Sequence, residues 1–125
     1  TRFADIEIAL NPEIHETLSS ESVFDGWGYT TIESLSMIKS ALPQTTCWAS
    51  GGIRNGLDVA KSMCLGASAV GVAGKLLRPA TESTEAVLAT LQQFMSELKI
   101  SCFGLGVESS KDLNRSHILE ITDAD

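Results

Sequence analysis

The sequence predicts an α/β protein in which helices cover parallel strands. Two short apolar runs each lead into glycines, amphipathic segments flank these runs, and the elements alternate as helix, strand, helix, strand, helix. Such alternation is typical of βαβ units, whose strands are parallel and are covered by helices. Two short parallel strands do not make a stable sheet by themselves. Either the number of predicted strands is wrong or further strands come from elsewhere, and we favour the second explanation, in which this chain is incomplete on its own.

The first helix is predicted from Thr30 to Ala41. Thr30 and Glu33 have the spacing of a capping box, apolar residues follow on one face, and Pro43 cannot continue the helix. The second is predicted from Asn55 to Leu65, with Asn55 as N-cap and Gly66 as the stop. A third, the most strongly periodic, is predicted from about Ser83 to Lys99.

Two strands are predicted between these helices. Residues Thr45 to Ala49 are β-branched, aromatic or small and lie between a proline turn and two glycines. Residues Ala67 to Val72 form a second apolar run, which Gly74 ends. Both runs have the composition of strands buried on both faces. After the last helix we expect a short helix near 109–113 and an extended end at 118–121.

Composition excludes several classes of function. The chain has 125 residues and a net charge of -7, with only 9 Lys and Arg, which argues against a nucleic-acid or anionic-membrane partner. No apolar stretch approaches the roughly 20 residues of a membrane span and no leader opens the chain, so we expect a cytoplasmic protein. The three cysteines lack metal-site spacing and are expected to be buried, reduced thiols: Cys47, Cys64 and Cys102.

The segment from Ala49 to Gly56 is the most informative one for function. A predicted strand runs directly into Gly51 and Gly52 and then into a capped helix. Glycines allow the backbone to approach anionic oxygens closely, and the free N–H groups at a helix start can donate to them, so this arrangement favours phosphate binding. A plain tight turn remains the alternative.

A second glycine turn, Gly71 to Gly74, follows the next strand. Adjacent parallel strands would bring both turns to one rim. In (β/α)8 barrels the loops after strands seven and eight commonly hold a ligand phosphate. The predicted fold class is therefore the C-terminal portion of a (β/α)8 TIM barrel, comprising only its last strands and helices.

Several segments closely resemble the type 2 isopentenyl-diphosphate isomerases, and the resemblance covers most of the chain. The opening Thr1 to Glu7 is similar to the end of that family's Gly-Gly-Thr loop. The other matching segments are 24–31, 49–61, 66–67 and 71–77.

The resemblance implies an FMN enzyme that interconverts isopentenyl diphosphate and dimethylallyl diphosphate. It implies reduced flavin acting as acid and base, with Mg²⁺ on the diphosphate and NADPH as a further cofactor. Residues 1–125 would be the C-terminal part of one FMN-binding barrel domain. By resemblance, Thr1 would touch the flavin and two loops would hold the FMN phosphate through Gly52, Ile53, Arg54, Ala73 and Gly74.

The family's catalytic, substrate-binding and metal-binding residues lie upstream of the matching region. We accordingly assign no catalytic and no metal-binding residue to this chain. The expected partners are isopentenyl diphosphate, the upstream part of the same barrel and further copies in a homo-oligomer. Other candidates have simpler interpretations: His15 and His117 as surface residues, Trp27 as an anchor, Lys75 and Arg78 as solvated charges, and Met37, Met63 and Met95 as core.

Two alternatives stay open. The first is an FMN-dependent 2-hydroxy-acid oxidoreductase, whose family usually carries Asp before the two glycines where this chain has Ser50. The second is a non-catalytic phosphate-binding module that uses the same loops, for which 125 residues would be the natural length.

Overall fold

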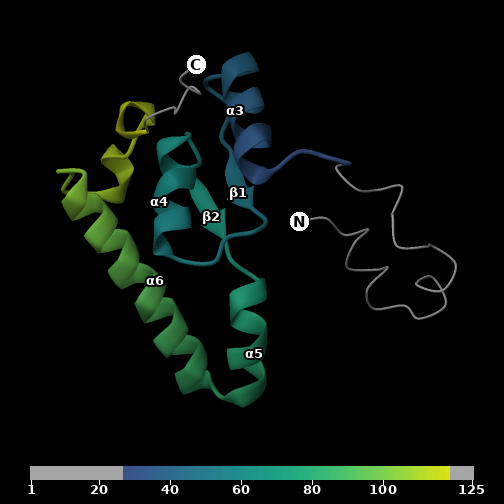
Figure 1. Ribbon diagram of the computed structural model, residues 1–125, viewed down its shortest axis with the longest axis vertical. Coiled ribbons are helices and arrows are strands. Elements are labelled where there is room, and N and C mark those ends of the chain that lie inside the picture. The colour runs from purple at the N-terminus through teal and green to yellow at the C-terminus, as the bar shows by residue number, and fades with distance from the viewer. Residues whose placement is uncertain (1–26, 119–125) are drawn as a thin grey trace, which may run out of the picture.

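The computed structural model describes residues 27–118, and its element order is that of βαβ units (Figure 1). The helix that connects the two strands lies beside the small sheet, and the long last α-helix runs along one side of the molecule. In chain order the elements are α3 (Thr31–Ala41), β1 (Trp48–Ser50), α4 (Gly56–Cys64), β2 (Ala69–Gly71), α5 (Gly74–Glu82), α6 (Thr84–Gly104), and the 3-10 helices η1 (Ser110–Asp112) and η2 (Arg115–His117).

The two strands are parallel and adjacent, as the sequence predicts. Trp48 pairs with Ala69, Ala49 with Val70, and Ser50 with Gly71. A right-handed crossover through a helix is the usual connection between parallel neighbours, and α4 provides the helix here. The carboxyl ends of both strands therefore lie at the same edge of the sheet.

The predicted helix starts and stops are confirmed for α3 and α4. Thr30 caps α3 in a complete capping box with Glu33, and Asn55 caps α4 by accepting from the N–H of Asp58. Gly66 follows α4 with φ +98°, a left-handed conformation that glycine adopts without steric cost. The short helix expected near 109–113 is η1, whereas the extended end at 118–121 falls almost wholly outside the described residues.

Helix α5 was not predicted, and α6 is longer than predicted. Ala73 gives α5 no side-chain cap, and Pro79 lies inside it, so the local sequence lacks the usual signals of a helix. Helix α6 begins at Thr84, close to the predicted start, with Ser83 as its N-cap, but continues past Lys99 to Gly104. The extension is explained by Cys102, which is buried against α4.

The core consists of two small clusters of buried residues rather than one large one. The first joins α3 to the sheet through Leu35, Cys47, Ala49 and Ala67. The second joins α4 to the C-terminal elements through Ala60, Cys64, Cys102 and Leu113. All three cysteines are buried and free, as predicted. Burial raises the pKa of the Cys64 thiol, with a smaller contribution from nearby Cys102.

The prediction that both strands are buried on both faces is wrong for the part of the chain that the structure describes. Ala49 is buried, but Trp48 is 80% exposed, and Ser50, Ala69 and Gly71 are also exposed. Within residues 27–118, helices cover only one face of the sheet.

The core assignment of the methionines also needs correction. Met37 and Met95 are exposed, at 51% and 59%, while Met63 is half-buried against the second cluster. Both exposed side chains lie on helix faces that no described element covers. In the part of the chain that the structure describes, no helix is long and apolar enough to cross a lipid bilayer.

Candidate functional site

Both glycine turns lie at the carboxyl edge of the sheet. Ser50 and Gly71 are partners in the parallel register, so Gly52 and Ala73 each lie two residues beyond the same level of the sheet. This is the edge at which open and closed α/β sheets bind their ligands. The strand register thus brings the two predicted phosphate-binding loops to neighbouring positions.

The turn after β1 depends on the backbone freedom of glycine. Gly51 has φ +101° and Gly52 has φ +72°, a region that other residues rarely adopt. A Cβ added at Gly52 would meet no atom within 4 Å. Glycine is therefore needed at this position for its conformation, and the space above it is open to a ligand.

A side chain that the sequence analysis did not single out holds this turn. The Thr31 hydroxyl, in the first turn of α3, lies 3.0 Å from the carbonyl oxygen of Ser50 and 2.8 Å from that of Gly51. It donates across 19 and 20 residues of sequence, so spacing alone gives no sign of it. The only local indication was that Thr31 is a second threonine, directly after the predicted cap Thr30.

Much of the N–H donor capacity at the start of α4 is already used within the protein. The N–H of Arg54 donates to Asp58 Oδ2 at 3.0 Å, and the N–H of Asp58 donates to Asn55 Oδ1 at 2.8 Å. The N–H of Gly56 donates to Glu97 Oε2 at 2.6 Å. Arg54 can therefore donate its N–H to a ligand only in competition with the Asp58 carboxylate.

Helix α6 fixes the start of α4 through Gly56 and Glu97. A Cβ at Gly56 would collide with Phe94 O, and would lie 2.5 Å from Leu98 N and 2.6 Å from Glu97 Cβ. The absence of a side chain thus lets the two helices approach closely. The hydrogen bond from the Gly56 N–H lowers the pKa of the Glu97 carboxyl, and a second bond from the Gln93 side chain adds to this.

The turn after β2 is less constrained than the turn after β1. Ala73, at φ −125° and ψ −64°, precedes α5 and makes no side-chain capping bond. Gly74 is the first residue of α5, so its N–H has no acceptor within the helix. Both residues are exposed, and a Cβ at Gly74 would meet nothing within 4 Å.

The residues predicted to contact FMN differ in whether their N–H groups are already bonded and in whether they line a cavity. Outside the regular elements of residues 27–118, the backbone hydrogen bonds do not include the N–H groups of Gly52, Ile53 or Ala73, which leaves these donors for a ligand anion. Gly52 and Ile53 line a cavity of about 550 Å³ that Arg54, Ala73 and Gly74 do not line. Thr1 lies outside the described residues.

The cavity at the first turn has mixed polarity. Charged groups at its wall come from Glu33, Asp58 and Lys61, and Thr31 also lines it. The hydrogen bonds from the N–H and hydroxyl of Thr30 lower the pKa of Glu33. Within the described part of the chain, no group of three His, Cys, Asp or Glu side chains could hold a metal ion.

Comparison with known proteins agrees with this geometry. The model of the FMN-dependent dehydrogenase family matches residues 25–120, which include both glycine turns. The isopentenyl-diphosphate delta-isomerase of Stutzerimonas stutzeri is 34% identical over 98% of this chain and 35% of its own length. That of Pseudescherichia vulneris is 41% identical over 84% of this chain and 30% of its own length.

A third relative, the isopentenyl-diphosphate delta-isomerase of Mycolicibacterium vanbaalenii, is 41% identical over 76% of this chain and 28% of its own length. The chain thus spans about a third of the curated relatives that it matches. The family implies FMN as cofactor and a portion of a TIM barrel as fold. The chain belongs to the FMN-dependent dehydrogenase family and is homologous, over part of their length, to isopentenyl-diphosphate isomerases.

Proposed function

We propose that this chain is the FMN-phosphate-binding part of a (β/α)8 barrel that interconverts isopentenyl diphosphate and dimethylallyl diphosphate. The observation that carries the proposal is the in-register parallel pairing of β1 and β2, because both strands then end at the same edge of the sheet, where both glycine turns begin. Overall identity to isopentenyl-diphosphate delta-isomerases, over matches long enough to include both turns, supports the substrate class. Residues 1–125 would then form the C-terminal part of one domain.

The phosphate would be held by backbone N–H groups of both turns: those of Gly52 and Ile53 on the first, and those of Ala73 and Gly74 on the second. The Arg54 N–H would join them once it leaves Asp58. Thr1 remains a proposed flavin contact. Bound FMN, reduced at the expense of NADPH, would supply acid and base chemistry to the substrate. The residues described here would bind and orient its phosphate tail.

The rest of the barrel must cover the open face of the sheet. A Trp48 side chain that is 80% exposed on a parallel strand is unusual, because such strands are normally buried on both faces. Relatives about three times as long as this chain are consistent with further strands. We propose that upstream residues of the same barrel supply these strands, the catalytic groups and the Mg²⁺ ligands, and that the complete protein is a homo-oligomer.

An FMN-dependent 2-hydroxy-acid oxidoreductase is the second candidate, since the family description names a dehydrogenase. Ser50 before the two glycines favours the isomerase. One experiment distinguishes the two activities. Isopentenyl diphosphate and a 2-hydroxy acid are each added to the full-length protein, and the compound that changes the flavin spectrum identifies the substrate class. A response to the hydroxy acid alone would replace the isomerase proposal with the oxidoreductase.

A non-catalytic module is distinguished by mass and by turnover. The native protein should be far heavier than 13.3 kDa, because a barrel needs about 250 residues. The 125 residues alone, given FMN, NADPH and Mg²⁺, should not convert isopentenyl diphosphate, whereas adding the upstream part should restore conversion. Turnover by the 125 residues alone would contradict the proposed division of labour.

The phosphate site itself is tested by Gly52→Val in the full-length protein. A β-branched residue at φ +72° is strained, and its Cβ would project toward the anion, so FMN should be lost while the fold persists. The measurement is the flavin absorbance that remains after gel filtration, with circular dichroism as the control for folding. Undiminished flavin would count against this site.

A further inference from the structure

The Thr31 hydroxyl contacts two consecutive peptide groups of the first glycine turn. Its single proton is shared between the Ser50 carbonyl at 3.0 Å and the Gly51 carbonyl at 2.8 Å. The Gly51 carbonyl and the Gly52 N–H belong to the same peptide group. Because a trans peptide is planar and none of the described bonds is cis, these two groups point in opposite directions. Holding the carbonyl toward α3 therefore directs the Gly52 N–H away from α3.

This constraint matters because the turn is otherwise easily deformed. Glycine occupies both sides of the peptide, and positive and negative φ cost it about the same. A rotation of the peptide plane would exchange the two groups, turning a carbonyl oxygen toward the place where the N–H had pointed. An anion would then face an acceptor in place of a donor. A side chain that fixes the carbonyl prevents this exchange.

We propose that Thr31 is a positioning residue for the flavin phosphate: by holding the Ser50 and Gly51 carbonyls, it keeps the Gly52 N–H aimed at the anion. The inference rests on the proposed function, since it takes the anion to be the FMN phosphate. It adds a side chain on α3 to a site formed otherwise by backbone groups. It also assigns the anion to the side of the turn that faces away from the Thr31 hydroxyl.

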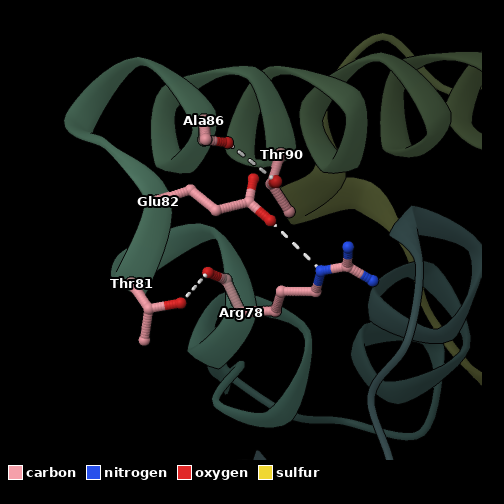
Figure 2. Close-up of polar contacts among 5 residues, drawn as sticks. All are labelled: Arg78, Thr81, Glu82, Ala86 and Thr90. Atoms are coloured by element: carbon pink, nitrogen blue, oxygen red, sulfur yellow. Dashed lines mark hydrogen bonds and ion pairs between the residues drawn. The ribbon is translucent and has the colours of Figure 1, made fainter.

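The test compares FMN with riboflavin, which has the same ring system but no phosphate. Dissociation constants for both are measured by fluorescence quenching on the full-length apoprotein and on three variants. Thr31→Val keeps the shape and removes the hydroxyl, and Thr31→Ser keeps the hydroxyl. Thr90→Val is the matched control, because Thr90 is also half-buried and its hydroxyl donates to a helix carbonyl, Ala86 O at 2.9 Å, away from the turn (Figure 2).

Thr31→Val should weaken FMN binding about tenfold, as loss of one net hydrogen bond to the turn implies, and should change riboflavin binding less than about twofold. Thr31→Ser and Thr90→Val should bind both ligands like the unmodified protein. Equal weakening of FMN and riboflavin by Thr31→Val would overturn the inference, as would no change in either. If valine prevents folding in a thermal melt, Thr31→Ala is measured in its place against the same criteria.

Measurements on the unmodified protein distinguish a failure of the proposed function from a failure of the role given to Thr31. If FMN binds no more tightly than riboflavin, the phosphate contributes nothing to affinity, and the proposed function of the turns is rejected. A clear preference for FMN that survives in Thr31→Val would leave that function intact and reject only the role of Thr31.

Discussion

The two glycine turns lie side by side but are built differently. Side chains from three helices hold the turn after β1 and the helix start that follows it: Thr31 from α3, Asp58 from α4 and Glu97 from α6. The turn after β2 has no capping side chain, and its residues Ala73 and Gly74 are exposed. One half of the proposed anion site is therefore preorganised by the fold, while the other depends on the backbone alone.

The turn after β1 is held in one geometry, whereas the turn after β2 can adapt to its ligand. A preorganised turn loses little conformational entropy when an anion binds, which favours affinity. A turn without side-chain restraints can adjust to the ligand at a larger entropic cost. Substitutions at the first turn should therefore affect stability as well as binding, whereas substitutions at the second should affect stability little.

The largest effect is expected from Gly56→Ala. Its Cβ would enter the backbone of α6 between Phe94 and Leu98, so the helices must separate, at a cost of about 3 kcal/mol in the free energy of unfolding. Urea denaturation of the full-length protein measures it. Gly104→Ala, at the end of α6 with no atom within 4 Å of its Cβ, is the control and should cost nothing. Equal effects would mean that the close approach of α4 and α6 is not as described.

A smaller loss is expected from Asn55→Ala. The variant leaves the Asp58 N–H without its cap and should cost about 1 kcal/mol of unfolding free energy. Asn55→Ser should recover most of that, because serine also caps helices. Urea denaturation midpoints measure both variants. If Asn55→Ser is as unstable as Asn55→Ala, the Asn55 amide has a role other than capping.

Glu97 should contribute a pH-dependent part of the stability. Its folded-state pKa lies below the ordinary 4.5 because the Gly56 N–H, and then the Gln93 amide, bond to the carboxylate. A lowered pKa means that the contribution is fully present above the unfolded-state pKa and is lost as the pH falls through the folded-state value. Denaturation midpoints between about pH 6 and pH 3 should fall less steeply in Glu97→Gln. Parallel profiles for the two proteins would argue against this bond in solution.

The smallest effect is expected from Arg78→Ala on α5. Its pair with Glu82, at 3.1 Å, is a surface pair in which the two side chains are 90% and 54% exposed (Figure 2). Such pairs contribute little in water, so the unfolding free energy should change by less than about 0.5 kcal/mol. A loss above about 1 kcal/mol would show that α5 restrains the second turn through its surface after all.

Sequence alone predicted the parts of the fold that depend on local chemistry. The predicted caps Thr30 and Asn55 lie three residues from the N–H groups that they satisfy, so their spacing is visible in the sequence. Helix α5 was not predicted because it lacks such local signals: Ala73 offers no cap, and Pro79 suggests a break.

Partners far apart in sequence were beyond prediction. Thr31 reaches a turn 20 residues away, and Glu97 reaches a backbone N–H 41 residues away. The first glycine turn was predicted, because the positive φ of Gly51 and Gly52 is a local property that glycine allows. Strand burial was overestimated because the apolar pattern of Trp48 and Ala69 suits a sheet covered on both faces, whereas the described residues cover one.

The exposed tryptophan on β1 offers an optical signal of barrel closure. These 125 residues contain 2 tryptophans, so replacing Trp27 with phenylalanine, and any tryptophan of the added wall likewise, would leave Trp48 as the single indole emitter. Within residues 27–118 its side chain is largely exposed. Docking of the remaining wall against this face would shift its emission to shorter wavelength and shield it from iodide. Closure of the barrel could then be timed without labels, and compared with the time at which flavin binds.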